Sequence, residues 1–166
     1  MAPWDRCEES FIVSHTALEY LDPSEKDCYT KNQYTRQKGE RMNIVGHIDL
    51  EKFYCVTRDI TTDEVVITDT QIRHICERHP GDYERFSKYF SEILSDPDYI
   101  IKANRPYTAV ILKEITDGSE RFQTILRLCT SLEPEGYKNS IITFMKIDEK
   151  RWNRYLRTKE ILYRKE

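Results

Sequence analysis

Residues 65–81 read VVITDTQIRHICERHPG, and within them a β-branched run changes into a helical pattern. The β-branched residues are typical of a strand, and we predict a short one at 64–67. Thr68 and Gln71 have the spacing of a capping box, whose two side chains bond backbone amides at the start of a helix. The sequence therefore predicts a helix that runs from this box to His79 and stops at the Pro-Gly pair that follows.

The predicted helix carries two histidines on different sides. Four residues recur at the spacing i, i+3, i+4 and i+7 that is typical of one buried face, namely Ile72, Ile75, Cys76 and His79. His74 and Arg78 form an i, i+4 pair on another side, where a solvent-facing position is the simpler interpretation. We therefore expect His79 to face the interior and His74 to face solvent.

The remaining elements predict an α+β domain. A second helix is expected at about 82–95, with an inward face made of Phe86, Phe90, Ile93 and Leu94. The pattern then changes to a period of two, which predicts strands at 99–103, 107–115, 121–129 and 140–147. A helix at 148–158 and a short strand at 161–164 follow, and one or two strands precede at 44–59. Helices followed by an antiparallel meander are typical of the α+β class.

The first part of the chain differs from the rest in regularity and charge. Residues 1–43 are polar and irregular, and we interpret them as an N-terminal extension that is partly ordered at most. Residues 1–66 contain 8 basic and 13 acidic residues, whereas residues 146–166 contain 8 basic and 4 acidic residues. A basic end is able to meet phosphate, although a solvated helix face is the simpler explanation. We predict two parts, 1–43 and 44–166.

Composition excludes several classes of protein. The 166 residues carry a net charge of −3, and 39% are hydrophobic and 11% aromatic, which argues against disorder across the whole chain. No apolar run approaches the roughly 20 residues that span a bilayer, and the N-terminus lacks the pattern of a signal peptide. Five cysteines without a CxxC pair favour free thiols. We therefore expect a cytoplasmic protein with no membrane partner.

A zinc site is the main metal-binding alternative. Cys55, His74, Cys76 and His79 are residue types that zinc uses. Two histidines five residues apart on a helix point in different directions, however, so a small core residue is the simpler interpretation of Cys76. The sequence predicts no metal and no cofactor.

Five short stretches, taken in order, resemble the phage- and mobile-element-associated members of the barnase–EndoU–colicin–RelE-like nuclease superfamily. They are VVITD at 65–69, HI and RHP within 74–80, ILSDPDYI at 93–100, ITFMKI at 142–147 and LYRK at 162–165. The resemblance covers about residues 44–166. It implies a metal-independent ribonuclease fold, in which N-terminal helices pack on a four- or five-stranded antiparallel sheet. It also implies an active site on the exposed face of that sheet.

The resemblance points to a helical histidine and a late-strand hydroxyl as catalytic residues. Cleavage by a 2′-hydroxyl needs a base, an acid and cations that stabilise the charge growing on the phosphate. His79, and second to it His74, suit the proton transfers because imidazole titrates near neutral pH. Arg78 suits the phosphate, and Thr143 is able to donate a hydrogen bond to it. Each has a plain alternative: a helix cap, a solvent-facing pair, or a β-branched strand residue.

Four further cations are candidates for binding substrate. Arg121 and Arg127 share a polar strand face with Gln123 and are able to line an RNA path, although a solvated outer face is the simpler interpretation. Lys146 points to the face opposite Thr143 if the strand is regular. Lys165 lies at the end of the chain and is a candidate only if the last strand forms.

Two functions follow from these observations. The first is a metal-independent endoribonuclease that produces a 2′,3′-cyclic phosphate, with RNA as partner. The alternative is a non-catalytic module of the same fold, binding an immunity or antitoxin-like protein or a phage structural protein. The acidic first part and the net negative charge motivate the alternative.

Overall fold

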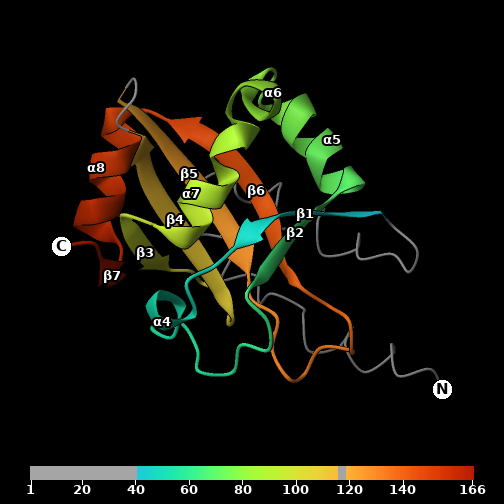
Figure 1. The fold of residues 1–166 in the computed structure, drawn as a ribbon. Coiled ribbons are helices and arrows are strands. Elements are labelled where there is room, and N and C mark those ends of the chain that lie inside the picture. The colour runs from blue at the N-terminus through green and yellow to red at the C-terminus, as the bar shows by residue number, and fades with distance from the viewer. Residues whose placement is uncertain (1–40, 116–118) are drawn as a thin grey trace.

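A seven-stranded mixed sheet forms the centre of the computed structural model, which describes residues 41–115 and 119–166 (Figure 1). The predicted N-terminal extension lies almost wholly outside the described residues. The strands are arranged in the order β1-β2-β6-β5-β4-β3-β7. Their bounds are Met42–His47 for β1, Glu64–Thr68 for β2, Tyr99–Lys102 for β3, Thr108–Ile115 for β4, Glu120–Arg127 for β5, Asn139–Ile147 for β6 and Ile161–Arg164 for β7.

The sheet is larger than the resemblance implied. The predicted meander is present, since β3, β4, β5 and β6 pair antiparallel with their neighbours. The expectation of four or five antiparallel strands is wrong, because β1 extends one edge beside β2 and β7 extends the other beside β3. In addition, β2 and β6 run parallel, with Val65 opposite Asn139 and Val66 opposite Ser140. A parallel pair requires a long crossover, which the intervening helices and strands provide.

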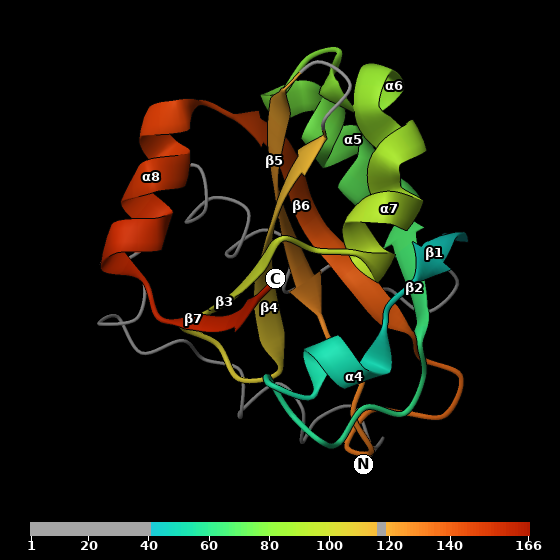
Figure 2. The same cartoon turned by 60° about the vertical axis from the view of Figure 1, so that its left-hand side comes forward.

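Helices cover both faces of the sheet (Figures 1 and 2). On one face lie α5, α6 and α7, and α8 lies on the other. Their bounds, with those of the short α4 and a 3₁₀ turn η1, are Leu50–Phe53 for α4, Asp69–Arg78 for α5, Asp82–Phe86 for α6, Ser87–Tyr89 for η1, Phe90–Ser95 for α7 and Glu149–Thr158 for α8. Within the described ranges, no helix combines the length and apolarity needed to cross a membrane.

The single helix predicted at 82–95 is instead a chain of three short pieces. Phe86 adopts φ −121°, outside the helical range, and this residue ends the first piece. The inward face is nevertheless correct, because Phe86, Phe90, Ile93 and Leu94 are all buried. Burial of an apolar face therefore holds these pieces in place although the helical hydrogen-bond ladder is interrupted.

Each face of the sheet has its own core. Under α5–α7 the rings of Phe122 and Phe144 stack at 5.3 Å, and Phe90 meets Phe144 edge-on at 4.8 Å. Under α8, Trp152 and Tyr155 pack with strand residues that include Ile125. The alternation predicted for β5 is confirmed, since Phe122 lies in the first core and Ile125 in the second. The sheet is therefore buried on both sides over much of its area.

The start of α5 is as predicted, but its buried face is rotated. Thr68 and Gln71 form the capping box, in which the Thr68 amide donates to the Gln71 side chain at 3.0 Å. This bond draws Gln71 into the interior, and His74 follows on the same side three residues later. His74 is consequently buried at 8% exposure, so the expected solvent-facing position is wrong. His79, expected inside, is half-buried.

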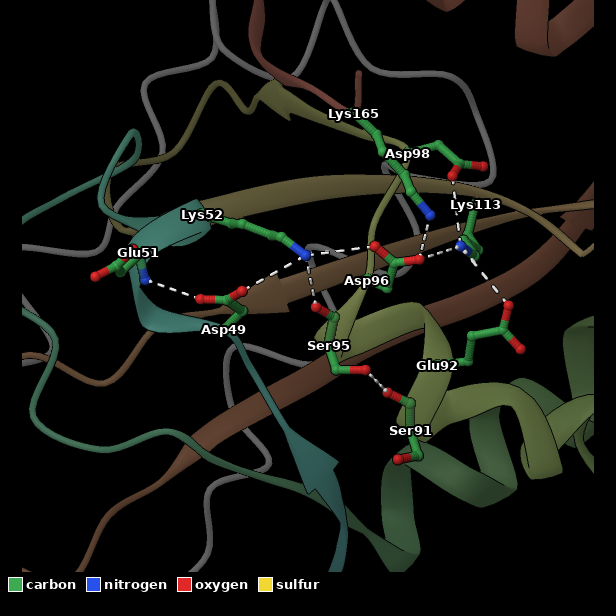
Figure 3. A network of polar contacts seen from close by, with 10 residues as sticks. All are labelled: Asp49, Glu51, Lys52, Ser91, Glu92, Ser95, Asp96, Asp98, Lys113 and Lys165. Carbon is green, nitrogen blue, oxygen red and sulfur yellow. Dashed lines mark hydrogen bonds and ion pairs between the residues drawn. The ribbon is translucent and has the colours of Figure 1, made fainter.

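A polar cluster joins the end of α7 to α4, β4 and the end of β7 (Figure 3). We call it the Asp96 cluster. The Lys113 side chain is only 4% exposed, and its ammonium lies 3.1 Å from Asp96 and 3.4 Å from Asp98. Lys52 lies 3.3 Å from Asp96, and Lys165 also contacts it. Hydrogen bonds from Lys165, Lys113 and Lys52 together hold the pKa of Asp96 well below its usual range, although burial acts in the opposite direction.

We expect Asp96→Asn to lower the free energy of unfolding by about 1–2 kcal/mol, because it leaves buried Lys113 with one carboxylate fewer. The depressed pKa means that wild type carries this stability at neutral pH and loses it as the pH falls below about 4, the ordinary value for aspartate. Chemical denaturation at pH 3–7 measures both effects. Glu77→Gln, at an exposed position on α5, is the matched control. Identical pH profiles for D96N and wild type would refute this account.

Candidate active site

A tight turn at the end of α5 meets the end of β6. His79 closes the helix by donating its amide to the Ile75 carbonyl at 2.8 Å, and its own carbonyl accepts the Asp82 amide at 3.1 Å. Gly81 makes the turn possible with φ 84°, a left-handed conformation that glycine adopts without strain. The Asp82 carboxylate then accepts the backbone amide of Lys146 at 3.3 Å. The turn is thereby attached to the strand that leads directly into α8.

The imidazole of His79 has an unusual environment. Its Nε2 atom is buried and has no hydrogen-bond partner among the residues that the structure describes. Burial lowers the pKa of His79, the positive charges of Arg151 and Arg78 lower it further, and Asp82 opposes them. His79 is therefore held neutral at neutral pH, as a proton acceptor with two guanidinium groups in its field. We call His79, Arg78, Asp82 and Arg151 the His79 site.

Two of the predicted substrate-binding cations lie at the same end of the sheet. Lys146 lies opposite Phe122 and Arg121 lies opposite Ile147 in the β5–β6 register. The Lys146 ammonium is 3.0 Å from Glu120 and the Arg121 guanidinium is 2.5 Å from Glu114. Both cations are thus paired with carboxylates, which an incoming phosphate would have to replace.

The other predicted residues are placed elsewhere. Thr143 is fully buried at 0% exposure, and His74, on α5, is also buried. Arg127 lies opposite Ser140, at the far end of β6 from Lys146, and pairs with Glu133 at 2.8 Å. Lys165 belongs to the Asp96 cluster. Among the site residues predicted from the sequence, the structure therefore groups His79 with Arg78 and brings Lys146 and Arg121 to the same end of the sheet.

The polar strand face of β5 is not a solvated outer face. Gln123, between Arg121 and Arg127, is fully buried. Arg127 itself is only 12% exposed. The interpretation of this face as solvated is therefore wrong, because α8 packs on the side of the sheet that the two-residue period had marked as polar.

Sequence reasoning missed Asp82 and Arg151. Asp82 directly follows the Pro-Gly pair that ends the helix. Its position in a turn, three residues after a candidate histidine, is a signal that could have identified it from the sequence. Arg151 gave no such signal, because only the packing of α8 against the sheet brings its charge to His79. Long-range placement of this kind does not follow from spacing along the chain.

The zinc alternative does not assemble. Within residues 41–115 and 119–166, no group of three or more histidine, cysteine or acidic side chains is arranged to hold a metal ion. Cys55 is exposed beyond α4. The Cys76 thiol lies 3.6 Å from Glu84, and burial raises its pKa, as does the neighbouring carboxylate.

We expect the His79 imidazole to make folding stability pH-dependent. Its lowered pKa means that the unfolded chain takes up a proton below about pH 6.5 while the folded chain resists it, so stability falls as the pH drops through this value. In His79→Gln this part of the pH dependence should disappear. Thermal unfolding between pH 5 and 8 measures it.

The control for this prediction is His47→Gln. His47 is an exposed imidazole that lies 3.1 Å from Asp63, outside the His79 site. This variant should keep the fall in stability below about pH 6.5. A wild-type profile in His79→Gln would show that burial of the ring does not control its protonation.

Comparison with known proteins gives one match. A family model described as phage-Barnase-EndoU-ColicinE5/D-RelE like nuclease2 matches residues 40–164. Every described residue except Lys165 and Glu166 lies in this range, including the whole His79 site. Neither the curated proteins nor the solved structures gave a match.

Proposed function

The chain belongs to the phage-Barnase-EndoU-ColicinE5/D-RelE like nuclease2 family, and we propose that it is an endoribonuclease whose active centre is the His79 site. The family match confirms the resemblance inferred from the sequence motifs. Cleavage uses the RNA's own 2′-hydroxyl and needs no metal ion. RNA is therefore the substrate class, and the residues that matter are those able to move protons and hold a phosphate.

The proposed reaction is an in-line transesterification. Neutral His79 accepts the 2′-hydroxyl proton as the oxygen attacks the adjacent phosphorus, and Arg78 and Arg151 stabilise the negative charge that grows on the phosphate oxygens. The bond to the 5′-oxygen breaks, and that oxygen takes up a proton. The products are a 2′,3′-cyclic phosphate and a free 5′-hydroxyl. His74 is buried apart from the His79 site, so we assign the proton that the 5′-oxygen takes up to a water molecule.

One observation carries this proposal. The His79 Nε2 atom is buried and has no hydrogen-bond partner among the described residues. His79 lies within the range that the family model matches, and the positive charges of two arginines act on its imidazole. Buried polar atoms nearly always have a hydrogen-bond partner, so an imidazole nitrogen without one suggests that a bound ligand supplies the missing hydrogen bond. A neutral ring is also the protonation state that a general base requires.

We expect purified wild type to cleave single-stranded RNA in the presence of chelator and to leave 2′,3′-cyclic phosphate ends, identified by mass spectrometry. His79→Gln should lower catalytic efficiency by about 10²–10⁴, the usual contribution of a general base. Arg78→Gln and Arg151→Gln should each lower it about 10²-fold. The rate should fall at acidic pH, where His79 becomes protonated.

Arg73→Gln is the control, since Arg73 is an exposed arginine on the same helix as Arg78. It should keep wild-type activity. Absence of cleavage by wild type between pH 5 and 9, or full activity in the His74→Gln/His79→Gln double variant, would contradict the proposal. The first result would favour the non-catalytic interaction module.

Thr143 is expected not to contact the phosphate, because its side chain is fully buried. Thr143→Val keeps the side-chain shape and removes the hydroxyl. We expect turnover and KM to stay close to the wild-type values. Any loss should appear in thermal stability instead, since removing a buried hydroxyl costs about 1 kcal/mol of hydrogen bonding. Turnover that falls by about two orders of magnitude without loss of stability would restore Thr143 to the catalytic set.

A further inference from the structure

We infer that the exposed face of α8 binds the phosphate backbone of the RNA strand that leads away from the His79 site. This inference rests on the proposed function. It concerns phosphates that do not react, and it assigns residues that neither the sequence motifs nor the proposed catalytic step uses. We call Lys150, Arg154 and Arg157 the α8 basic face.

The three side chains lie on one side of the helix. They are all exposed, and they follow one another at intervals of four and three residues. At 3.6 residues per turn and 1.5 Å per residue, they fall within an arc of about 60° and extend about 10 Å along the axis. The opposite side of α8 is anchored, because Trp152 and Tyr155 are buried in the second core. The apolar anchor therefore holds the basic face outward in a fixed orientation.

Lys150 and Arg157 are not neutralised by the acidic residues of α8. The helix and its C-cap residue, Lys159, together contain five basic residues and one acidic residue, Glu149. Glu149 is directed to Arg121 at 3.9 Å, and the Asp148 carboxylate accepts the Arg151 amide at 2.7 Å as the helix N-cap. Among the residues that the structure describes, no ion pair involves Lys150 or Arg157. The exposed charges of Lys150 and Arg157 are thus complementary to a polyanion.

The α8 basic face begins beside the His79 site. Arg151, whose charge acts on His79, is the next residue after Lys150. From there the exposed cations continue along two turns of helix, away from the reacting phosphate. A small anion would use one cation, whereas a row of this length fits successive phosphates of one strand. Contacts to phosphate position a nucleic acid without selecting its sequence.

Binding at non-reacting phosphates has a defined kinetic signature. Such contacts are equally strong in the ground state and in the transition state, so their loss raises KM and leaves kcat unchanged. They also make affinity salt-dependent, with a slope of about −0.7 per phosphate for a single strand. A short substrate that does not reach α8 is insensitive to them.

The test compares Lys150→Gln/Arg157→Gln with wild type on a 20-nucleotide RNA and on a dinucleotide containing only the scissile phosphate. We expect KM for the long RNA to rise about tenfold at 50 mM salt, with turnover and all dinucleotide parameters unchanged. Losing two phosphate contacts lowers the salt slope by about 1.4, so raising salt from 50 to 200 mM weakens binding about sevenfold less than in wild type. Arg58→Gln/Arg73→Gln, which removes the same charge from exposed positions off α8, should leave these values unchanged.

Direct binding separates this inference from the proposed function. Fluorescence anisotropy of a labelled 20-nucleotide RNA needs no cleavage, so weaker binding by the α8 double variant supports the basic face even if wild type proves inactive. Equal affinity and equal salt slope in wild type and the α8 variant would overturn the inference. Equal weakening in the control variant would also overturn it, because general charge would then explain the binding.

Discussion

The parallel pairing of β2 with β6 is the constraint on which the candidate site depends. Because β2 pairs with the first residues of β6, it ends while roughly five residues of β6, about 17 Å, still extend beyond it. The chain fills this distance with α5, whose 10 residues span about 15 Å. The end of α5 therefore arrives at the end of β6, where α8 begins. An antiparallel β2 would send α5 the opposite way and separate His79 from Arg151.

Ionisable groups have two opposite arrangements in this fold. In the Asp96 cluster, buried Lys113 has carboxylates at 3.1 and 3.4 Å, so desolvation is offset by close partners and the cluster ties four segments together. At the His79 site a buried nitrogen has no partner among the described residues, and the negative charge of Asp82 is opposed by the positive charges of Arg151 and Arg78. The first arrangement stabilises the chain, and the second leaves a polar atom available for chemistry.

The helix α8 connects the two inferences. Its apolar side fixes Trp152 and Tyr155 on the sheet, its first turn brings Arg151 to the His79 site, and its outer side presents a row of cations. One amphipathic helix is therefore proposed to serve stability, catalysis and substrate binding through three different faces. A substitution on one face is expected to affect the matching property and to leave the other two largely unchanged, because the side chains point in separate directions.

Local chemistry in the sequence determined the class of fold, the family and most elements of this protein. The capping box at Thr68 and Gln71, the meander of strands and the helix capped by Asp148 were all predicted, because each depends on residues that are neighbours in the chain. Tertiary structure alone decided the mixed sheet, the burial of His74 and Gln123, and the approach of Arg151 to His79. These depend on pairings between segments tens of residues apart, and the packing energy of both sheet faces outweighs the local preference of any single residue.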